Sequence, residues 1–162
     1  MGRIPQGQIM KLEQQFKHLF PRAAMTVYST GGKLQEGANP REIYELQMLD
    51  HLMLFNVYSG LPKKPEEDSH YLFVIPVEDP RIYCMKEPHN NIKGHTSIPA
   101  ALSLRLEVYY AGRILFRNGE IAKWTNHSGH YQPETALYQN NLLPMHRRIL
   151  KPTLFKGMFT WI

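Results

Sequence analysis

The chain has 162 residues, of which 43% are hydrophobic, and its 19 basic and 14 acidic side chains give a formal net charge of +5. This length suits one domain with its own core, and the apolar fraction excludes a mostly disordered chain. No apolar run is long enough for a transmembrane helix, and the N-terminus lacks the apolar stretch of a secretory signal. We therefore expect a single domain, 1–162, that is cytoplasmic as synthesised, with any secretion independent of a signal peptide.

The positive charge is spread along the chain and is densest near the C-terminus, at His146, Arg147, Arg148 and Lys151. A charge of +5 permits nucleic-acid binding, but no zinc spacing, recognition helix or aromatic RNA-binding signature accompanies it, so a solvated face is favoured. Cys84 is the single cysteine, which excludes an internal disulfide. Its place in the apolar segment "RIYCMKE" predicts a buried, inert thiol.

Two helices are predicted in the first third of the chain. Apolar residues recur at helical spacing from Gln8 to Phe20, and Pro21 ends this segment. A second helix is expected to begin at Pro40, because Asn39 can cap it and Glu42 completes a capping box. Its apolar stripe consists of Ile43, Leu46, Leu49 and Met53.

Strands are predicted after a polar, proline-bearing loop. The runs His70 to Val77 and Arg81 to Glu87 are rich in β-branched and aromatic residues, and the turn "EDP" between them predicts a hairpin. After a polar loop, two more strands are expected around Asn118-Gly119, a dipeptide typical of a tight hairpin turn.

A polar corner and an apolar tail complete the chain. The segment "KWTNHSGHYQPET", 123–135, follows the last predicted strand, and Pro133 opens a predicted helix. The tail, 151–162, is expected to pack as an edge strand or to serve as a contact surface. The order of elements predicts an α+β fold: an antiparallel sheet of four to five strands packed with N-terminal helices and one helix after the SGHYQP corner.

Several short elements occur in an order that resembles a known module. They are Phe73-Val74, Ile82-Tyr83, His95-Thr96-Ser97, Ala111 to Ile114, an Asn-Gly turn, and Ser128 to Pro133. The segment 71–138 is similar to an SGHY-x-P module of plant IQ-motif calmodulin-binding proteins and of bacterial effector-like or toxin-like proteins. The resemblance implies a small effector-like or toxin-like protein that acts on a host or competitor component. Calmodulin is not an expected partner, because the IQ helix of the plant proteins is missing.

The candidate site residues lie in two polar loops. His95 and His130 are the candidate catalytic residues, because histidines beside hydroxyl groups can serve as general acid and base near neutral pH. The candidate ligand-binding residues are Thr96, Ser97, Asn126, Ser128 and Tyr131. These side chains would converge if both loops emerge at one edge of the sheet.

Whether the protein is an enzyme stays open at the level of sequence. The enzymatic alternatives are an ADP-ribosyltransferase-like activity, suggested by the triplets at Tyr28 and His95, and a metal-independent nuclease that uses His95 and His130. The other alternative is a non-catalytic module that binds a protein partner through an apolar patch. No metal site is predicted, since His127 and His130 lie in a loop and zinc needs three or four ligands. The sequence does not identify a cofactor.

Overall fold

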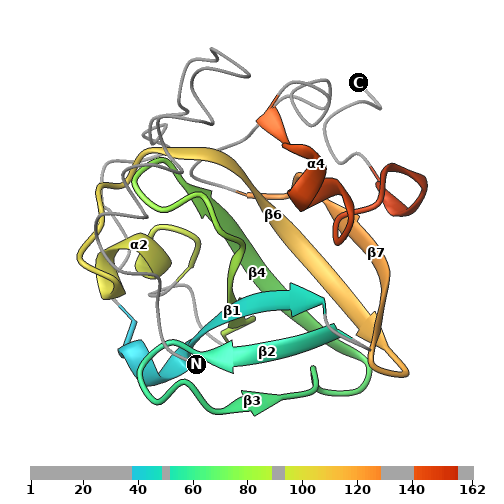
Figure 1. Cartoon of the computed structure of the whole chain (residues 1–162), viewed down its shortest axis with the longest axis horizontal. Coiled ribbons are helices and arrows are strands. Elements are labelled where there is room, and N and C mark those ends of the chain that lie inside the picture. Colours follow the sequence, from blue (N-terminus) through green and yellow to red (C-terminus); the bar gives the residue numbers. More distant parts are fainter. Residues whose placement is uncertain (1–37, 49–51, 89–93, 129–140, 157–162) are drawn as a thin grey trace.

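The computed structural model describes residues 38–48, 52–88, 94–128 and 141–156, and the statements below concern these residues. They form one seven-stranded antiparallel sheet in the order β3-β2-β1-β5-β4-β6-β7 (Figure 1). The strands are β1 (Ile43–Met48), β2 (Leu52–Asn56), β3 (Pro62–Lys63), β4 (Ser69–Pro76), β5 (Tyr83–Lys86), β6 (Val108–Arg117) and β7 (Glu120–Thr125). Two short helices, α2 (Ser97–Ala101) and α4 (Pro144–Arg147), and two 3₁₀ turns, η1 (Pro40–Glu42) and η2 (Pro152–Leu154), accompany this sheet.

The expected α+β fold with four to five strands and N-terminal helices is wrong. Seven strands make up most of the described structure, and its two α-helices span only five and four residues. The predicted helix from Gln8 to Phe20 and the helix predicted to begin at Pro133 lie outside the described residues.

The helix predicted to begin at Pro40 is a hairpin of β1 and β2, preceded by the turn η1. The predicted capping box does form, since Asn39 caps η1 and the Glu42 side chain accepts from the Asn39 N–H. At Ile43 the backbone becomes extended and pairs with β2 on one side and β5 on the other. Because β1 is an inner strand with apolar residues on both faces, it lacks the alternation that marks a half-exposed strand.

The two hairpins predicted from turn signals are confirmed. β4 pairs with β5, and β6 pairs with β7. Asn118 and Gly119 both have positive φ, 55° and 74°, as a two-residue turn that follows the twist of the strands requires. Cys84 is fully buried in β5, as predicted, and burial raises the pKa of its thiol.

An aromatic cluster joins the sheet to the C-terminal segment. The Trp124 ring lies 6.3 Å from Phe73, 5.9 Å from Tyr110 and 4.6 Å from Phe155, measured between ring centroids. The Trp124 indole N–H also donates to the Lys151 carbonyl oxygen at 2.8 Å. These contacts hold the start of the apolar tail against β7, where Phe155 makes an isolated parallel bridge with Trp124. The rest of the tail, 157–162, lies outside the described residues. They also place the segment that contains α4 beside the sheet (Figure 1).

Candidate functional site

The first predicted loop is packed into the protein. His95, Thr96 and Ser97 are all buried. The His95 Nε2 lies 2.6 Å from the Gly112 carbonyl oxygen of β6, and since a carbonyl only accepts, the ring nitrogen must donate. The hydroxyl oxygen of Ser97, the first residue of α2, accepts from the Gly94 N–H at 2.9 Å. These bonds hold the loop against β6.

The second predicted loop begins where β7 ends. Asn126 and Ser128 are buried, and His127 between them is half-buried. The His127 N–H donates to the Thr125 hydroxyl at 3.1 Å. Two of the predicted site residues, His130 and Tyr131, lie outside the described residues.

Gly112 of β6 contacts both the first predicted loop and the end of β7, the strand that precedes the second loop. Its carbonyl accepts from His95, while a Cβ built on its backbone would lie 1.8 Å from the Thr125 carbonyl oxygen. His95 and the end of β7 thus both lie next to Gly112, while the convergence of the two loops into one site stays a prediction. A buried imidazole that donates to a backbone carbonyl is a typical structural anchor. The catalytic role of His95 stays a prediction, as do the ligand-binding roles of its neighbours.

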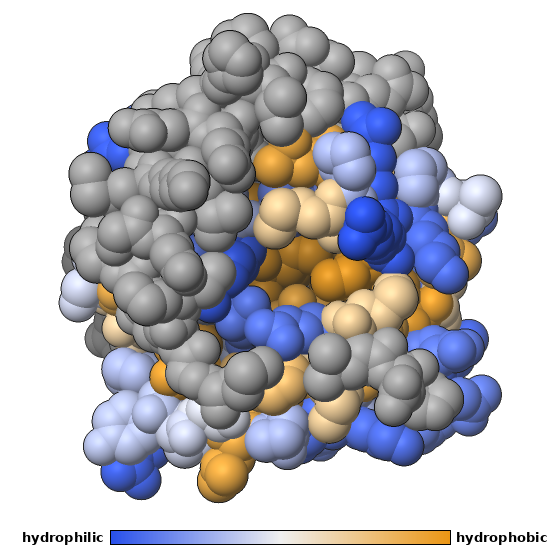
Figure 2. All heavy atoms as spheres, in the orientation of Figure 1, coloured by the Kyte–Doolittle hydropathy of each residue, from blue (hydrophilic) through white to orange (hydrophobic). Residues whose placement is uncertain are grey.

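A hollow of about 360 Å³ lies between β1 and α4. Figure 2 shows it near the middle of the view, with a hydrophobic floor and hydrophilic residues around its rim. Among the described residues its apolar lining consists of Leu46, Met48, Ile82, Met145 and Ile149, and its polar lining of Glu45, Gln47, Arg81 and His146. Small-molecule sites typically enclose about 300–1,000 Å³ and are lined in this way.

Two methionines at this hollow are unusually exposed. Met48 and Met145 expose 42% and 39% of their surface. Within the described ranges, the other large hydrophobic side chains with such exposure are Tyr58 and Leu61. Methionine is flexible and polarisable, so it adapts to apolar groups of different shapes. The pair therefore indicates an apolar contact surface around the hollow.

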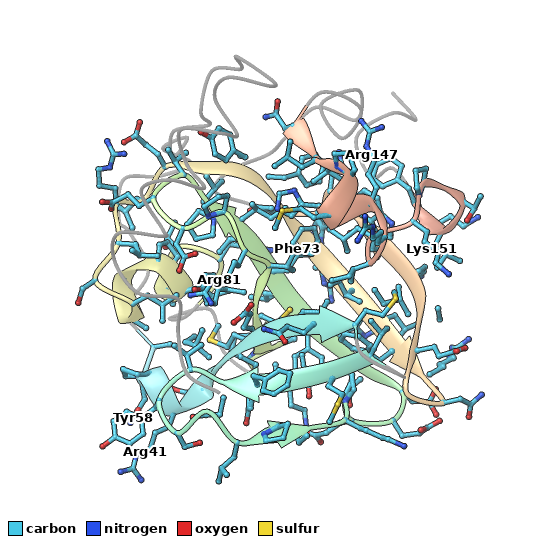
Figure 3. The ribbon with its side chains drawn as sticks, viewed as in Figure 1. Arg41, Tyr58, Phe73, Arg81, Arg147 and Lys151 are labelled. Carbon is cyan, nitrogen blue, oxygen red and sulfur yellow. The ribbon has the colours of Figure 1, made fainter. Side chains whose placement is uncertain are left out.

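The polar end of the hollow contains a buried ion-pair network centred on Arg81, which lies beside β1 in Figure 3. Its Nε and Nη2 donate to the two carboxylate oxygens of Asp79, each at 2.9 Å, and its Nη1 donates to Glu45 at 3.0 Å. The Tyr83 hydroxyl also donates to Asp79. Burial disfavours the charged form, but the hydrogen bonds to Asp79 and the electrostatic effects of Tyr83, Asp79 and Glu45 together outweigh it and raise the pKa of Arg81. Arg81 is thus a permanent, fixed cation.

His146 lines the hollow from α4. Its Nε2 donates to the Pro80 carbonyl oxygen at 2.6 Å, and its Nδ1 accepts from the Leu143 N–H at 3.0 Å. Burial lowers the pKa of His146 to about 4, although the hydrogen bond to Pro80 acts in the opposite direction. The ring is therefore neutral at pH 7, and the basic surface predicted around His146 begins only at Arg147.

We expect acid to destabilise the protein through His146. Below a pH of about 6.5 the unfolded histidine binds a proton, whereas the buried ring stays neutral until about pH 4. The folded pKa is the lower one, so stability is lost as the pH falls through this window, by up to about 3 kcal/mol. Urea unfolding at several pH values in this window measures the loss. His146→Gln does not titrate there and should lose less stability, and equal losses in both proteins would contradict this assignment.

A second hollow, of about 330 Å³, adjoins the first. The two share Met48 and Ile149 in their linings. The remaining described lining of the second hollow is Leu52, Glu120, Ile121, Lys151 and Leu154. The first hollow is mainly apolar, whereas the second also has the charged Glu120 and Lys151 in its lining. We call the two adjoining hollows together the β1–α4 groove.

Sequence reasoning missed this groove. The turn "EDP" predicts a hairpin connection, but Asp79 and Arg81 also flank its proline between two apolar strands. Opposite charges in such an apolar setting are a signal of a buried ion pair. Met48 and Met145 gave no comparable signal, because they lie far apart in the sequence.

Comparisons with protein-family models, with curated proteins and with solved structures find no match to this chain. Its similarity to the SGHY-x-P module therefore stays a prediction. In the part of the chain that the structure describes, no helix has both the length and the apolar character needed to cross a membrane.

Proposed function

We propose that the protein is a non-catalytic binding protein for a small, elongated, neutral and mainly apolar molecule. The observation that carries this proposal is the β1–α4 groove, whose two hollows share Met48 and Ile149. The exposed Met48 and Met145 add contact area that an apolar ligand would remove from water.

The polar end of the groove favours a neutral ligand. Arg81 is engaged by two carboxylates, so a ligand ion would lose its hydration without gaining a dedicated counter-charge. Gln47 lines the same hollow, and its amide nitrogen donates to Glu45 at 2.8 Å. The amide oxygen of Gln47 can accept a hydrogen bond, for example from a ligand hydroxyl. One such contact would orient an otherwise apolar molecule.

The sequence leaves three other functions open: a non-catalytic interaction module, an enzyme, and an effector-like or toxin-like protein. A non-catalytic role agrees with the buried His95, whose Nε2 is engaged by the Gly112 carbonyl. The ADP-ribosyltransferase-like and nuclease activities stay predictions that rest on sequence patterns. The effector-like or toxin-like role also stays a prediction, based on the resemblance of the segment 71–138, and a ligand-binding protein could serve such a role through a protein partner.

Titration with N-phenyl-1-naphthylamine, a neutral apolar fluorophore, tests the proposal. We expect a saturable rise in fluorescence with the wild-type protein. Met145→Lys adds a charge beside the groove and should weaken binding by about tenfold or more, because burying an ammonium group near the probe is costly. Leu61→Lys makes the same change at an exposed residue that lines neither hollow, so its affinity should equal that of the wild type.

Two results would count against the proposal. One is a wild-type protein that shows no saturable binding of the fluorophore. The other is an equal loss of affinity in Met145→Lys and Leu61→Lys, since this would locate binding outside the groove. Thermal unfolding of each variant confirms that the proteins compared are folded.

A further inference from the structure

A separate cluster of basic residues lies on one face of strands β4, β6 and β7. In the sheet register, Leu115 of β6 stands beside His70 and Lys123, and Arg113 stands beside Thr125. Side chains two residues apart on a strand point to the same side. These residues therefore share the sheet face opposite to the aromatic cluster around Phe73 and Trp124.

A small pocket of about 100 Å³ lies on this face. Its described lining consists of His70, Arg113, Leu115, Lys123, Thr125 and His127. Four of these six side chains carry or can acquire positive charge, and they come from three neighbouring strands and the loop after β7. We call this the basic pocket. It is distinct from the β1–α4 groove, with which it shares no lining residue.

Arg113 is held in a fixed position at the basic pocket. Its Nη2 donates to the Glu87 carboxylate, and its Nη1 donates to the His127 Nδ1 at 3.0 Å. Because Nδ1 accepts from a guanidinium, it is unprotonated in this arrangement. Lys123 is exposed and makes no ion pair within the described ranges. The permanent charges at the pocket are thus two cations, Arg113 and Lys123, and one carboxylate, Glu87.

Neighbouring charges act on both histidines of the basic pocket. Burial lowers the pKa of His127, and Arg113 lowers it further, while Glu87 raises it. Burial likewise lowers the pKa of His70; Arg113, Lys123 and Arg117 act in the same direction, and Glu87 acts against them. Both rings are therefore neutral at pH 7. A bound anion would favour their protonated forms, so anion binding should strengthen as the pH falls.

We propose that the basic pocket binds an oxyanion, the terminal phosphate group of a phosphomonoester. Arginine and lysine together form the charge-assisted hydrogen bonds that such a group needs, and Glu87 orients the arginine beforehand. The size of the pocket admits one tetrahedral group and leaves the rest of the ligand on the surface. A metal cation is disfavoured there, because the cationic side chains of Arg113 and Lys123 line the pocket.

Sodium sulfate is the first probe, because sulfate stays a dianion throughout the pH range in which histidine titrates. The histidine ring signals of the full-length protein are followed by NMR during titration, with sodium chloride at equal ionic strength as the reference. We expect saturable shifts of the His70 and His127 signals, with tighter binding at lower pH. Lys123→Gln should weaken binding by about tenfold. Lys64→Gln removes the same charge at an exposed residue away from the pocket and should leave the affinity unchanged.

The same titration is then repeated with three phosphate compounds to identify which kind of molecule supplies the phosphate group. They are inorganic phosphate, O-phosphoserine and adenosine 5′-monophosphate. Equal affinities would mean that only the phosphate is recognised, and a higher affinity for one ester would identify the class of ligand. The proposal is overturned if chloride causes the same shifts as sulfate, or if Lys64→Gln weakens binding as much as Lys123→Gln. Binding of N-phenyl-1-naphthylamine should be unchanged in Lys123→Gln, so the tests of the two sites are independent.

Discussion

Gly112→Ala is expected to destabilise the protein by about 3 kcal/mol or more, near the upper end of the range for overpacked cores. The added Cβ would lie 1.8 Å from the Thr125 carbonyl oxygen, 2.8 Å from its carbonyl carbon and 2.9 Å from the Phe73 ring. Two of these atoms belong to the backbone of β7, so a side-chain rotation does not remove the clash. The pairing of β6 and β7 must shift, and the hydrogen bond from His95 to Gly112 shifts with it.

Gly119→Ala is the matched control for this prediction. Gly119 lies in the β6–β7 turn with a φ of +74°, and no atom lies within 4 Å of the position of its Cβ. Gly119→Ala should lower the free energy of unfolding by only about 1 kcal/mol, which is the backbone strain of a non-glycine residue at positive φ. Urea unfolding of both variants gives the two free energies. A loss for Gly112→Ala no greater than that for Gly119→Ala would show that β6 and β7 do not pack closely at Gly112.

The hairpins were predictable because their signals are local. Asn118-Gly119 determines its own turn, and the short connection around "EDP" favours antiparallel pairing of the apolar segments on either side of it. The segment after Pro40 differs. Its capping box and apolar spacing are equally local, but they are compatible with a helix and with a turn before a strand. Pairing with β5, which is distant in sequence, decides in favour of the strand.

The candidate site was predictable only in part for the same reason. The sequence indicates polar loops at His95 and Asn126, and in the structure His95 bonds to Gly112 while Asn126 directly follows β7, the strand that pairs with β6. The sequence does not indicate the β1–α4 groove, because Glu45 and Arg81, which meet at its polar end, are 36 residues apart in the chain. The basic pocket likewise depends on strand register. Spacing within one segment therefore identifies loops and turns, whereas hollows arise from tertiary pairing.

Arg81→Met is expected to cost about 3–5 kcal/mol of stability, the range for breaking a buried ion pair from one side. The variant loses three hydrogen bonds and leaves the carboxylates of Asp79 and Glu45 buried without the cation between them. Methionine fills a similar volume, so most of the loss comes from charge rather than from a cavity. Urea unfolding near neutral pH measures it.

Lys86→Met is the control at the surface, because Lys86 pairs with Glu66 at 2.8 Å while both side chains are about half exposed. Solvent screens this pair, so its loss should cost no more than about 1 kcal/mol. A triple variant combines Arg81→Met with Asp79→Asn and Glu45→Gln, which also neutralise the two carboxylates. It should recover part of the stability lost in Arg81→Met, because it has no unpaired buried charge. Similar losses for Arg81→Met and Lys86→Met would mean that water reaches the network around Arg81. The polar end of the groove would then be hydrated, and the reason for expecting a neutral ligand would be lost.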